Sequence, residues 1–109
     1  MATFFRTKVV TNIGTTAVDA LQTVDNNRFT IIGCNLANTT IDDVYIDIFV
    51  IDSSSVVGYY VKGLKIPVNS SVKVITNGEK LILAEQCGLR IVADTESSVD
   101  AVISYAEIV

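Results

Sequence analysis

The residue types that carry most enzyme chemistry are scarce in this chain of 109 residues. Histidine is absent, which excludes Ser-His-Asp and Cys-His catalysis and the usual zinc sites. Tryptophan, the strongest stacking platform for sugars and bases, is absent too. No glycine-rich phosphate loop occurs. We therefore predict no catalytic, cofactor-binding or metal-binding residue, no cofactor, and a protein that is not an enzyme.

Four aspartates form the best candidate for a metal site: Asp42, Asp43, Asp47 and Asp52. Asp42 and Asp43 lie in a predicted loop, where oxygen ligands for Ca²⁺ could gather. Asp47 falls within a predicted strand, and the spacing of the four matches no calcium loop. We interpret them as solvated acids, with calcium as one alternative and the opposed carboxylates of a glycosidase as another.

The two cysteines, Cys34 and Cys87, stand among apolar residues of predicted strands. We expect buried free thiols that pack as small hydrophobic groups. A disulfide between them and a reactive thiol are the alternatives. The first residues, MATFFRTKVV, lack the apolar run of a secretion signal, which disfavours the disulfide. For the same reason we interpret the sequons at 38–40 and 69–71 as turns.

Composition indicates a protein that associates. Hydrophobic residues make up 50% of the chain and charged residues 18%, whereas soluble domains typically carry about 25% charge. No apolar run is long enough to span a membrane as a helix. The net charge of −4 leaves no basic surplus for nucleic-acid phosphates. We expect neither a nucleic-acid nor a membrane partner, and we expect the apolar surplus to be buried in self-association or on a larger assembly.

Period-two alternation and regularly spaced turn residues predict an all-β protein. One domain, residues 1–109, is expected to form a single antiparallel β-sandwich of about eight strands, either jelly-roll or Ig-like. Asn77-Gly78 predicts a type I′ hairpin turn. The predicted strands are 4–11, 15–24 (with a short helix as the alternative), 28–36, 44–51, 56–66, 72–76, 79–83, 89–93 and 99–105.

The stretch 28–51 holds the densest β-type sequence, and we expect its two strands to form a central hairpin joined at residues 37–43. In the first strand, alternation places Ile32 with Cys34 and Leu36 on one face, and Phe29 with Ile31 on the other. Gly33 within this strand suggests a bulge or a close backbone approach.

The second strand predicts one core face and one contact face. Val44, Ile46, Ile48 and Val50 alternate without interruption and form the core face. The opposite side chains, with Asp47 among them, are too apolar for open water. The tyrosines, including Tyr105, are ordinary half-buried strand aromatics, interface anchors or sugar contacts. We predict an interface made of Tyr45, Phe49, Ile51, Tyr59 and Tyr60.

Several segments together suggest a family. They are the initial MATFFR, Asn12-Ile13-Gly14-Thr15, TIIGCNLANTT at 30–40, Ile66-Pro67-Val68, Asn77-Gly78-Glu79-Lys80-Leu81 and VDAVISYAEI at 99–108. In this layout the chain resembles, over nearly its whole length, small virion structural proteins of tailed bacteriophages, especially phages of cyanobacteria and other aquatic bacteria. Cys34 departs from the aliphatic residue usual at that position.

The resemblance implies a non-enzymatic β-sandwich that acts as an oligomer in the virion, and it names no functional residue. We expect a capsid decoration (cement) protein, a homotrimer or similar oligomer, that binds the major capsid protein or other virion proteins. Neck, tail or baseplate accessories and a carbohydrate-binding jelly-roll module for host attachment are the alternatives. The expected location is the virion, assembled in the host cytoplasm and not secreted by a signal peptide.

Overall fold

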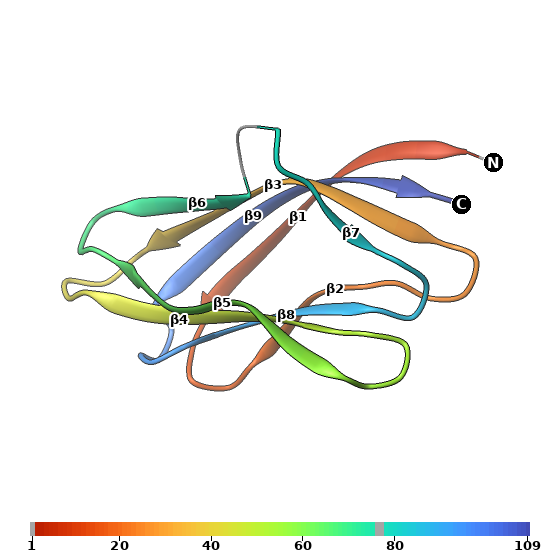
Figure 1. Cartoon of the computed structure of the whole chain (residues 1–109). Helices are drawn as coiled ribbons and strands as arrows, with labels where there is room; N and C mark the ends of the chain where they lie inside the picture. The colour runs from red at the N-terminus through yellow and green to blue at the C-terminus, as the bar shows by residue number, and fades with distance from the viewer. Residues whose placement is uncertain (1, 76–77) are drawn as a thin grey trace.

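The computed structural model describes residues 2–75 and 78–109, which form nine β-strands (Figure 1). Among these residues no helix is long and apolar enough to cross a membrane. The strands are β1 (Thr3–Ile13), β2 (Val18–Gln22), β3 (Arg28–Asn38), β4 (Val44–Ile51), β5 (Val57–Ile66), β6 (Ser71–Ile75), β7 (Leu81–Leu83), β8 (Gly88–Ala93) and β9 (Val99–Ile108). The ambiguous segment 15–24 therefore contains a strand, as the threonines predicted.

The strands pair into two antiparallel sheets, which confirms the predicted β-sandwich. The five-stranded sheet has the order β1-β9-β3-β6, with β7 also on β3, and the four-stranded sheet has the order β2-β8-β4-β5. The chain pairs like one long hairpin that has β4–β5 at its tip and is folded over on itself. Its successive pairs are β1–β9, β2–β8, β3–β6/β7 and β4–β5. This wrapping is the jelly-roll topology, so the Ig-like alternative is excluded.

The core lies between the two sheets and is made mostly of β-branched and leucine side chains. In β4 the predicted core face is confirmed, because Val44, Ile46 and Ile48 are buried and Val50 is half-buried. β-branched side chains suit a half-buried pleated surface, so propensity and burial agree here. The largest fully buried side chains are Ile13, Ile31, Leu36, Val44, Ile46, Ile48, Ile66, Leu83, Leu89, Ile91, Val99 and Ile103.

The expected central hairpin is wrong, because β3 and β4 belong to opposite sheets. The connection between them crosses from one sheet to the other and is fastened by the buried Asn38. Its Nδ2 donates to the carbonyl oxygens of Asp42 (2.7 Å) and Ile66 (3.0 Å). The turn-forming residues between β3 and β4 thus stabilise a connection between two sheets. A hairpin turn uses the same residue types, so the sequence does not distinguish the two kinds of connection.

The face assignment within β3 is also wrong, because Phe29 and Ile31 share the core face with Cys34 and Leu36. The register of β3 against β9 shifts between Ile31 and Gly33, which marks a bulge at Ile32. The extra residue reverses the alternation, so Ile31 and Cys34 both face the core while Ile32 is 41% exposed. The bulge suggested by Gly33 is therefore present, and it places Ile32 on the outer face.

The strands on either side of Asn77-Gly78 pair with β3, whereas the sequence predicted that they pair with each other as a hairpin. Asn77 lies outside the described residues, while Gly78 has a φ of +84°, a left-handed conformation that favours glycine. β6 pairs with β3 at residues 34–37 and β7 pairs with β3 at residues 29–31, so the two lie end to end along one strand. Pairing with β3 has taken the place of local pairing between them.

Candidate interface surfaces

The outer face of the four-stranded sheet brings together four of the five predicted interface residues. Tyr45 and Tyr59 are exposed, and Phe49 and Ile51 are half-buried. Phe49 lies opposite Tyr59 in the β4–β5 register, and the two rings meet edge to face with centroids 5.8 Å apart. We name this surface the aromatic face.

Tyr60, the fifth predicted residue, does not lie on the aromatic face. The β4–β5 register shifts between Ile48 and Phe49, which pair with Val61 and Tyr59, so Tyr60 is the extra residue of a bulge. Its ring packs against the core, and its hydroxyl donates to the carboxylate of Glu79. That hydrogen bond, together with burial, raises the pKa of Tyr60 to about 12. Tyr60 therefore serves the interior of this chain.

The acidic groups of the aromatic face are paired within the chain. Asp47 lies 3.2 Å from the Lys62 ammonium, and its other oxygen accepts from the amide of Gly63 (2.8 Å). This carboxylate raises the pKa of Lys62. The Lys62 ammonium also stands 4.5 Å from the centroid of the Tyr59 ring, in a cation–π contact. At the far side of the sheet, Asp19 bonds Arg90 at 2.5 Å.

Three of the four aspartates considered as calcium ligands, Asp43, Asp47 and Asp52, make separate contacts within the chain. Asp43 accepts from the amide of Val68 (3.0 Å) and pairs with Lys65 (3.3 Å), and both contacts lower the pKa of Asp43, the amide more. Asp52 accepts from two amides of its own turn. In residues 2–75 and 78–109, no three His, Cys, Asp or Glu side chains gather as a metal site would require. These carboxylates thus accept hydrogen bonds from loop amides and form ion pairs with lysines.

The outer face of the five-stranded sheet differs in kind. The strand registers align its outward side chains into rows that cross the sheet. The two outermost rows, Thr3–Ile108–Arg28 and Asp100–Ala37–Ser71, carry Arg28 and Asp100, and Lys73 is the one charged residue of the three rows between them. These middle rows are Val9–Val102–Asn35–Lys73, Thr7–Ser104–Gly33 and Phe5–Ala106–Thr30–Ile82. We name this surface the plain face, because aliphatic, aromatic and small polar side chains make up almost all of it.

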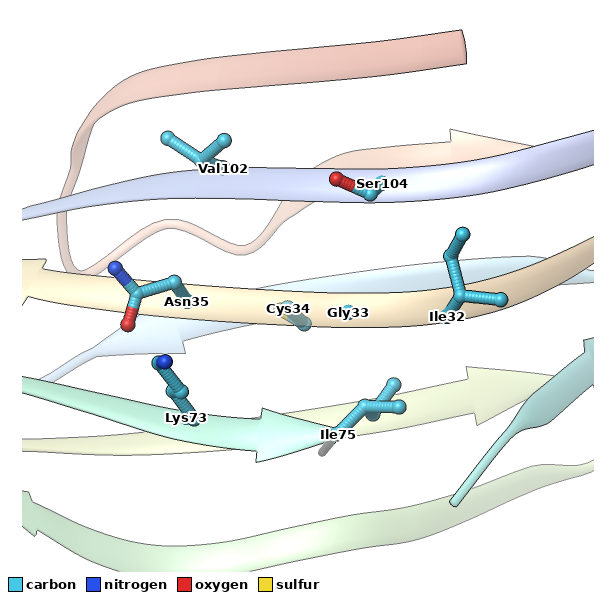
Figure 2. Close-up of a pocket in the computed structure, with 8 residues that line it drawn as sticks. All are labelled: Ile32, Gly33, Cys34, Asn35, Lys73, Ile75, Val102 and Ser104. Atoms are coloured by element: carbon cyan, nitrogen blue, oxygen red, sulfur yellow. The ribbon is translucent and has the colours of Figure 1, made fainter. Parts of the chain in front are cut away.

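A hollow of about 310 Å³ lies in the plain face where β9, β3 and β6 run side by side (Figure 2). Gly33 leaves its floor open, since a Cβ placed there would meet nothing within 4 Å. Val102 and Ile32 border it, and Lys73 and Asn35 share its polar side. The Asn35 Oδ1 is buried and accepts no hydrogen bond from the described residues. The hollow is therefore open to solvent and mixed in polarity, and the Asn35 oxygen in its lining has no donor among the described residues.

Both cysteines are free and buried, as the sequence predicted. Burial raises the pKa of the Cys34 thiol to about 11. A thiol with so high a pKa stays neutral and is a poor nucleophile. Cys34 therefore acts as a core residue beneath the hollow.

Sequence reasoning missed the contribution of β1 to the exposed apolar surface. Phe5, the most exposed residue of its type at 80%, projects from the plain face. Arg6 and Lys8 lie opposite Tyr105 and Ile103, on the side that faces the other sheet. The alternation of Phe5 and Val9 with two cations was a usable signal, but the usual assumption that apolar side chains face inward gives the wrong side.

No family model matches the chain, and no curated protein matches its sequence. Among solved structures it is similar to a chain of the disulfide-linked pili that form Bacillus endospore appendages. The identity is 12%, 97% of this chain and 87% of that chain are covered, and the TM-score is 0.56. At this identity the similarity shows a shared fold.

A subviral particle of infectious bursal disease virus VP2 also aligns. The identity is 11%, with 99% of this chain and 32% of the VP2 chain covered, and a TM-score of 0.44. This chain therefore spans about a third of VP2, and the similarity is too distant to support a functional argument.

Proposed function

We propose that this chain is a non-enzymatic structural component of a tailed-phage virion, and specifically an oligomeric capsid decoration (cement) protein. One observation carries the proposal: large apolar side chains stay exposed on both outer sheet faces of a chain with only 18% charged residues. Exposed apolar surface of this kind marks sites of association. The resemblance to small phage virion proteins supports the virion as the place.

The aromatic face is the surface proposed to meet another virion subunit. Tyr45, Phe49, Ile51 and Tyr59 supply aromatic and aliphatic anchors of the type that dominates interface energies. Because Asp47 and Lys62 are already paired within the chain, burying them requires no charged partner. A homotrimer or similar oligomer, seated on the major capsid protein, would use this face between subunits.

Weak single contacts suffice for such a role. At about 25 cal/mol per Å², a contact of about 300 Å² contributes about 7 kcal/mol. The loss of translational and rotational freedom costs roughly 4–15 kcal/mol, so one contact alone is marginal. An oligomer that touches the shell at several points gains effective concentration, and stable binding then needs no chemistry beyond burial.

The first test is the mass of the purified chain by light scattering across a concentration series. We expect an oligomer, and a chain that is monomeric even near millimolar concentration and fails to bind purified shells overturns the proposal. The second test is copy number in particles purified from infected cells. Hundreds of copies support capsid decoration, whereas about a dozen or fewer favour the neck, tail or baseplate alternative.

A further inference from the structure

β1 is an edge strand that the sandwich itself does not cover. Its seven residues from Thr3 to Val9 are all exposed. They pair on one side with β9 and have their other edge open. Figure 1 shows the first half of β1 and the end of β9 extending together toward the N and C labels. Main-chain N–H and C=O groups along such an edge are a template for pairing with another strand.

The other three sheet edges carry features that discourage pairing. β2 is five residues long and its register shifts between Asp19 and Leu21. β5 has two register shifts and a left-handed Gly63. β6 and β7, which form the remaining edge, are only five and three residues long. Short edge strands, bulges and irregular backbone are the devices by which proteins avoid edge-to-edge association.

β1 has none of these features over most of its length. Its register with β9 is unbroken from Thr3 to Val10. The ladder continues beyond the strand, since Ala2 and Val109 exchange two backbone hydrogen bonds of 2.8 and 2.9 Å. No proline or acidic residue occurs in β1, and its Arg6 is neutralised by Glu107 at 2.6 Å. The edge is therefore regular from Thr3 to Val10, and its charged side chains are Arg6, which is paired with Glu107, and Lys8.

We infer that two copies of this chain pair through β1, antiparallel and about a two-fold axis, so that their five-stranded sheets join into one. The axis passes at Thr7, which sets Thr7 opposite its own counterpart and Phe5 opposite Val9 of the other copy. The inference goes beyond the aromatic-face contact proposed above. It shares with that proposal the claim that the chain self-associates.

The side chains of the plain face are complementary in this register. Each copy already places Val9 beside Val102 and Phe5 beside Ala106. Joining the edges extends the row Val102–Val9 into Phe5–Ala106 of the partner copy, and the hydroxyls of Thr7 meet at the centre. Aromatic residues opposite β-branched residues and threonine opposite threonine are favourable cross-strand pairs.

Self-complementary side chains select a second β1 as the occupant. At the β5 edge, Lys62 and Lys65 are already paired with Asp47 and Asp43, and the two register shifts of that strand leave no unbroken ladder for β1. In the β1–β1 pair, Lys8 stands beside Arg6 of the partner copy, whose charge Glu107 offsets. The two-fold pair therefore joins the longest edge strands among the described residues, with Lys8 opposite Arg6 as its like-charge contact.

The test uses two exposed valines on edge strands as a matched pair. Val9 is 57% exposed and Val57, on β5, is 53% exposed. Removing a two-fold contact divides any assembly into equal halves, whether that assembly is a dimer or a pair of rings. We expect Val9→Glu to halve the mass measured by light scattering, while Val57→Glu keeps the β1 pair.

Oxidative cross-linking reads the register directly. Thr7→Cys is expected to form a disulfide-linked dimer on a non-reducing gel, because opposed residues of antiparallel strands lie within disulfide range. Thr3→Cys, with the same exposure class four residues away, faces position 11 of the partner copy and is expected to stay unlinked. The native cysteines are buried and do not interfere.

The outcomes separate this inference from the proposed function. A Val9→Glu chain that keeps the wild-type mass while the wild type is oligomeric overturns β1 pairing and leaves the decoration role standing. Loss of the cross-link from Thr7→Cys together with its appearance in Thr3→Cys overturns the register. A wild-type chain that is monomeric at every concentration overturns both. Circular dichroism of each variant confirms that the fold is retained.

Discussion

The two outer faces of this jelly roll differ in how their exposed charged and apolar side chains are arranged. On the aromatic face, Asp47 and Lys62 neutralise one another and Lys62 caps the ring of Tyr59. On the plain face, the three middle rows of side chains hold one charge, that of Lys73, around an open hollow at Gly33. The charged groups of the aromatic face are paired within the chain. The plain face instead exposes apolar groups that no contact among the described residues covers.

The difference teaches that apolar composition alone does not locate an interface. Phe49 and Ile51 stand on a surface that is already organised by its own contacts, so a partner adds burial to a preformed site. Phe5 and Val9 stand on a strand that is covered on neither face. The changes below test which face does what, from the largest expected effect to the smallest.

The largest effect is expected from Ile31 and Ile32, neighbouring residues that lie on opposite faces of β3. Ile31→Asp places a carboxylate in the core and should cost about 4 kcal/mol or more of unfolding free energy, enough to unfold a small domain. Ile32→Asp places it on the plain face and should cost about 1 kcal/mol or less. Urea denaturation measures both. Equal losses would mean that Ile32 does not face outward.

Phe49→Asp should separate assembly from folding. Losing the edge-to-face contact with Tyr59 and part of a half-buried ring costs about 1–2 kcal/mol of unfolding free energy, so the fold survives. Binding to another virion subunit should weaken about tenfold or more, because a buried charge replaces an aromatic anchor.

Val102→Asp on the plain face is the control for Phe49→Asp. Sedimentation velocity and shell-binding assays compare the two variants. If Val102→Asp abolishes shell binding while Phe49→Asp leaves it intact, the roles of the two faces are reversed. Unfolding of Phe49→Asp would instead mean that the aromatic face is part of the core.

Filling the hollow should stabilise the chain. Gly33→Val adds a β-branched side chain in open space at a position without a left-handed φ, and it should raise the unfolding free energy by about 0.5–1 kcal/mol. Thermal denaturation checks this. Shell binding is expected to be unchanged. A drop in binding would show that a partner side chain enters the hollow and that the plain face also contacts the shell.

Acid should lower the stability of the fold by a small amount, through one carboxylate associated with each sheet. The Val68 amide and Lys65 lower the pKa of Asp43, and Arg6 with Asn27 lowers the pKa of Glu107. A carboxylate whose folded pKa is depressed contributes stability above its ordinary pKa of about 4 and loses it as the pH falls through the folded value. The melting temperature should therefore decline below about pH 4.

Single variants apportion that decline between the sheets. Asp43→Asn removes the part of the decline in melting temperature that comes from the four-stranded sheet. Glu107→Gln removes the part that comes from the β1–β9 pair. Each should flatten the melting temperature against pH and lower it slightly at neutral pH. A wild-type melting temperature that is constant down to about pH 3 would contradict both pairings.

Local pattern predicted the elements of this fold and failed where pairing is long-range. The alternation of β4 identified Val44, Ile46 and Ile48 as core and Tyr45 as outward, because one strand between a core and solvent needs no knowledge of its neighbours. The Asn77-Gly78 signal predicted a local hairpin, yet its flanking strands pair with β3, some forty residues earlier. Competition between partners is decided by the whole sheet.

The candidate interfaces were predicted in part for the same reason. Tyr45, Phe49 and Ile51 came from alternation in β4, and Tyr59 was chosen as a tyrosine of the strand that pairs with β4. Tyr60 was misplaced by a bulge that its sequence does not announce. The exposure of Phe5 depends on β1 lying at an edge, which is a property of strand order and cannot be obtained from residue spacing.

The position of β9 also decides when this protein can fold during synthesis. β9 lies between β1 and β3 in the five-stranded sheet, so those early strands have no partner in common until residues 99–108 have left the ribosome. Non-local pairings of this kind close slowly. Nascent chains carry β1 unpaired throughout that interval, which exposes them to aggregation with one another. Folding speed and chaperone dependence are therefore expected to follow the completion of β9.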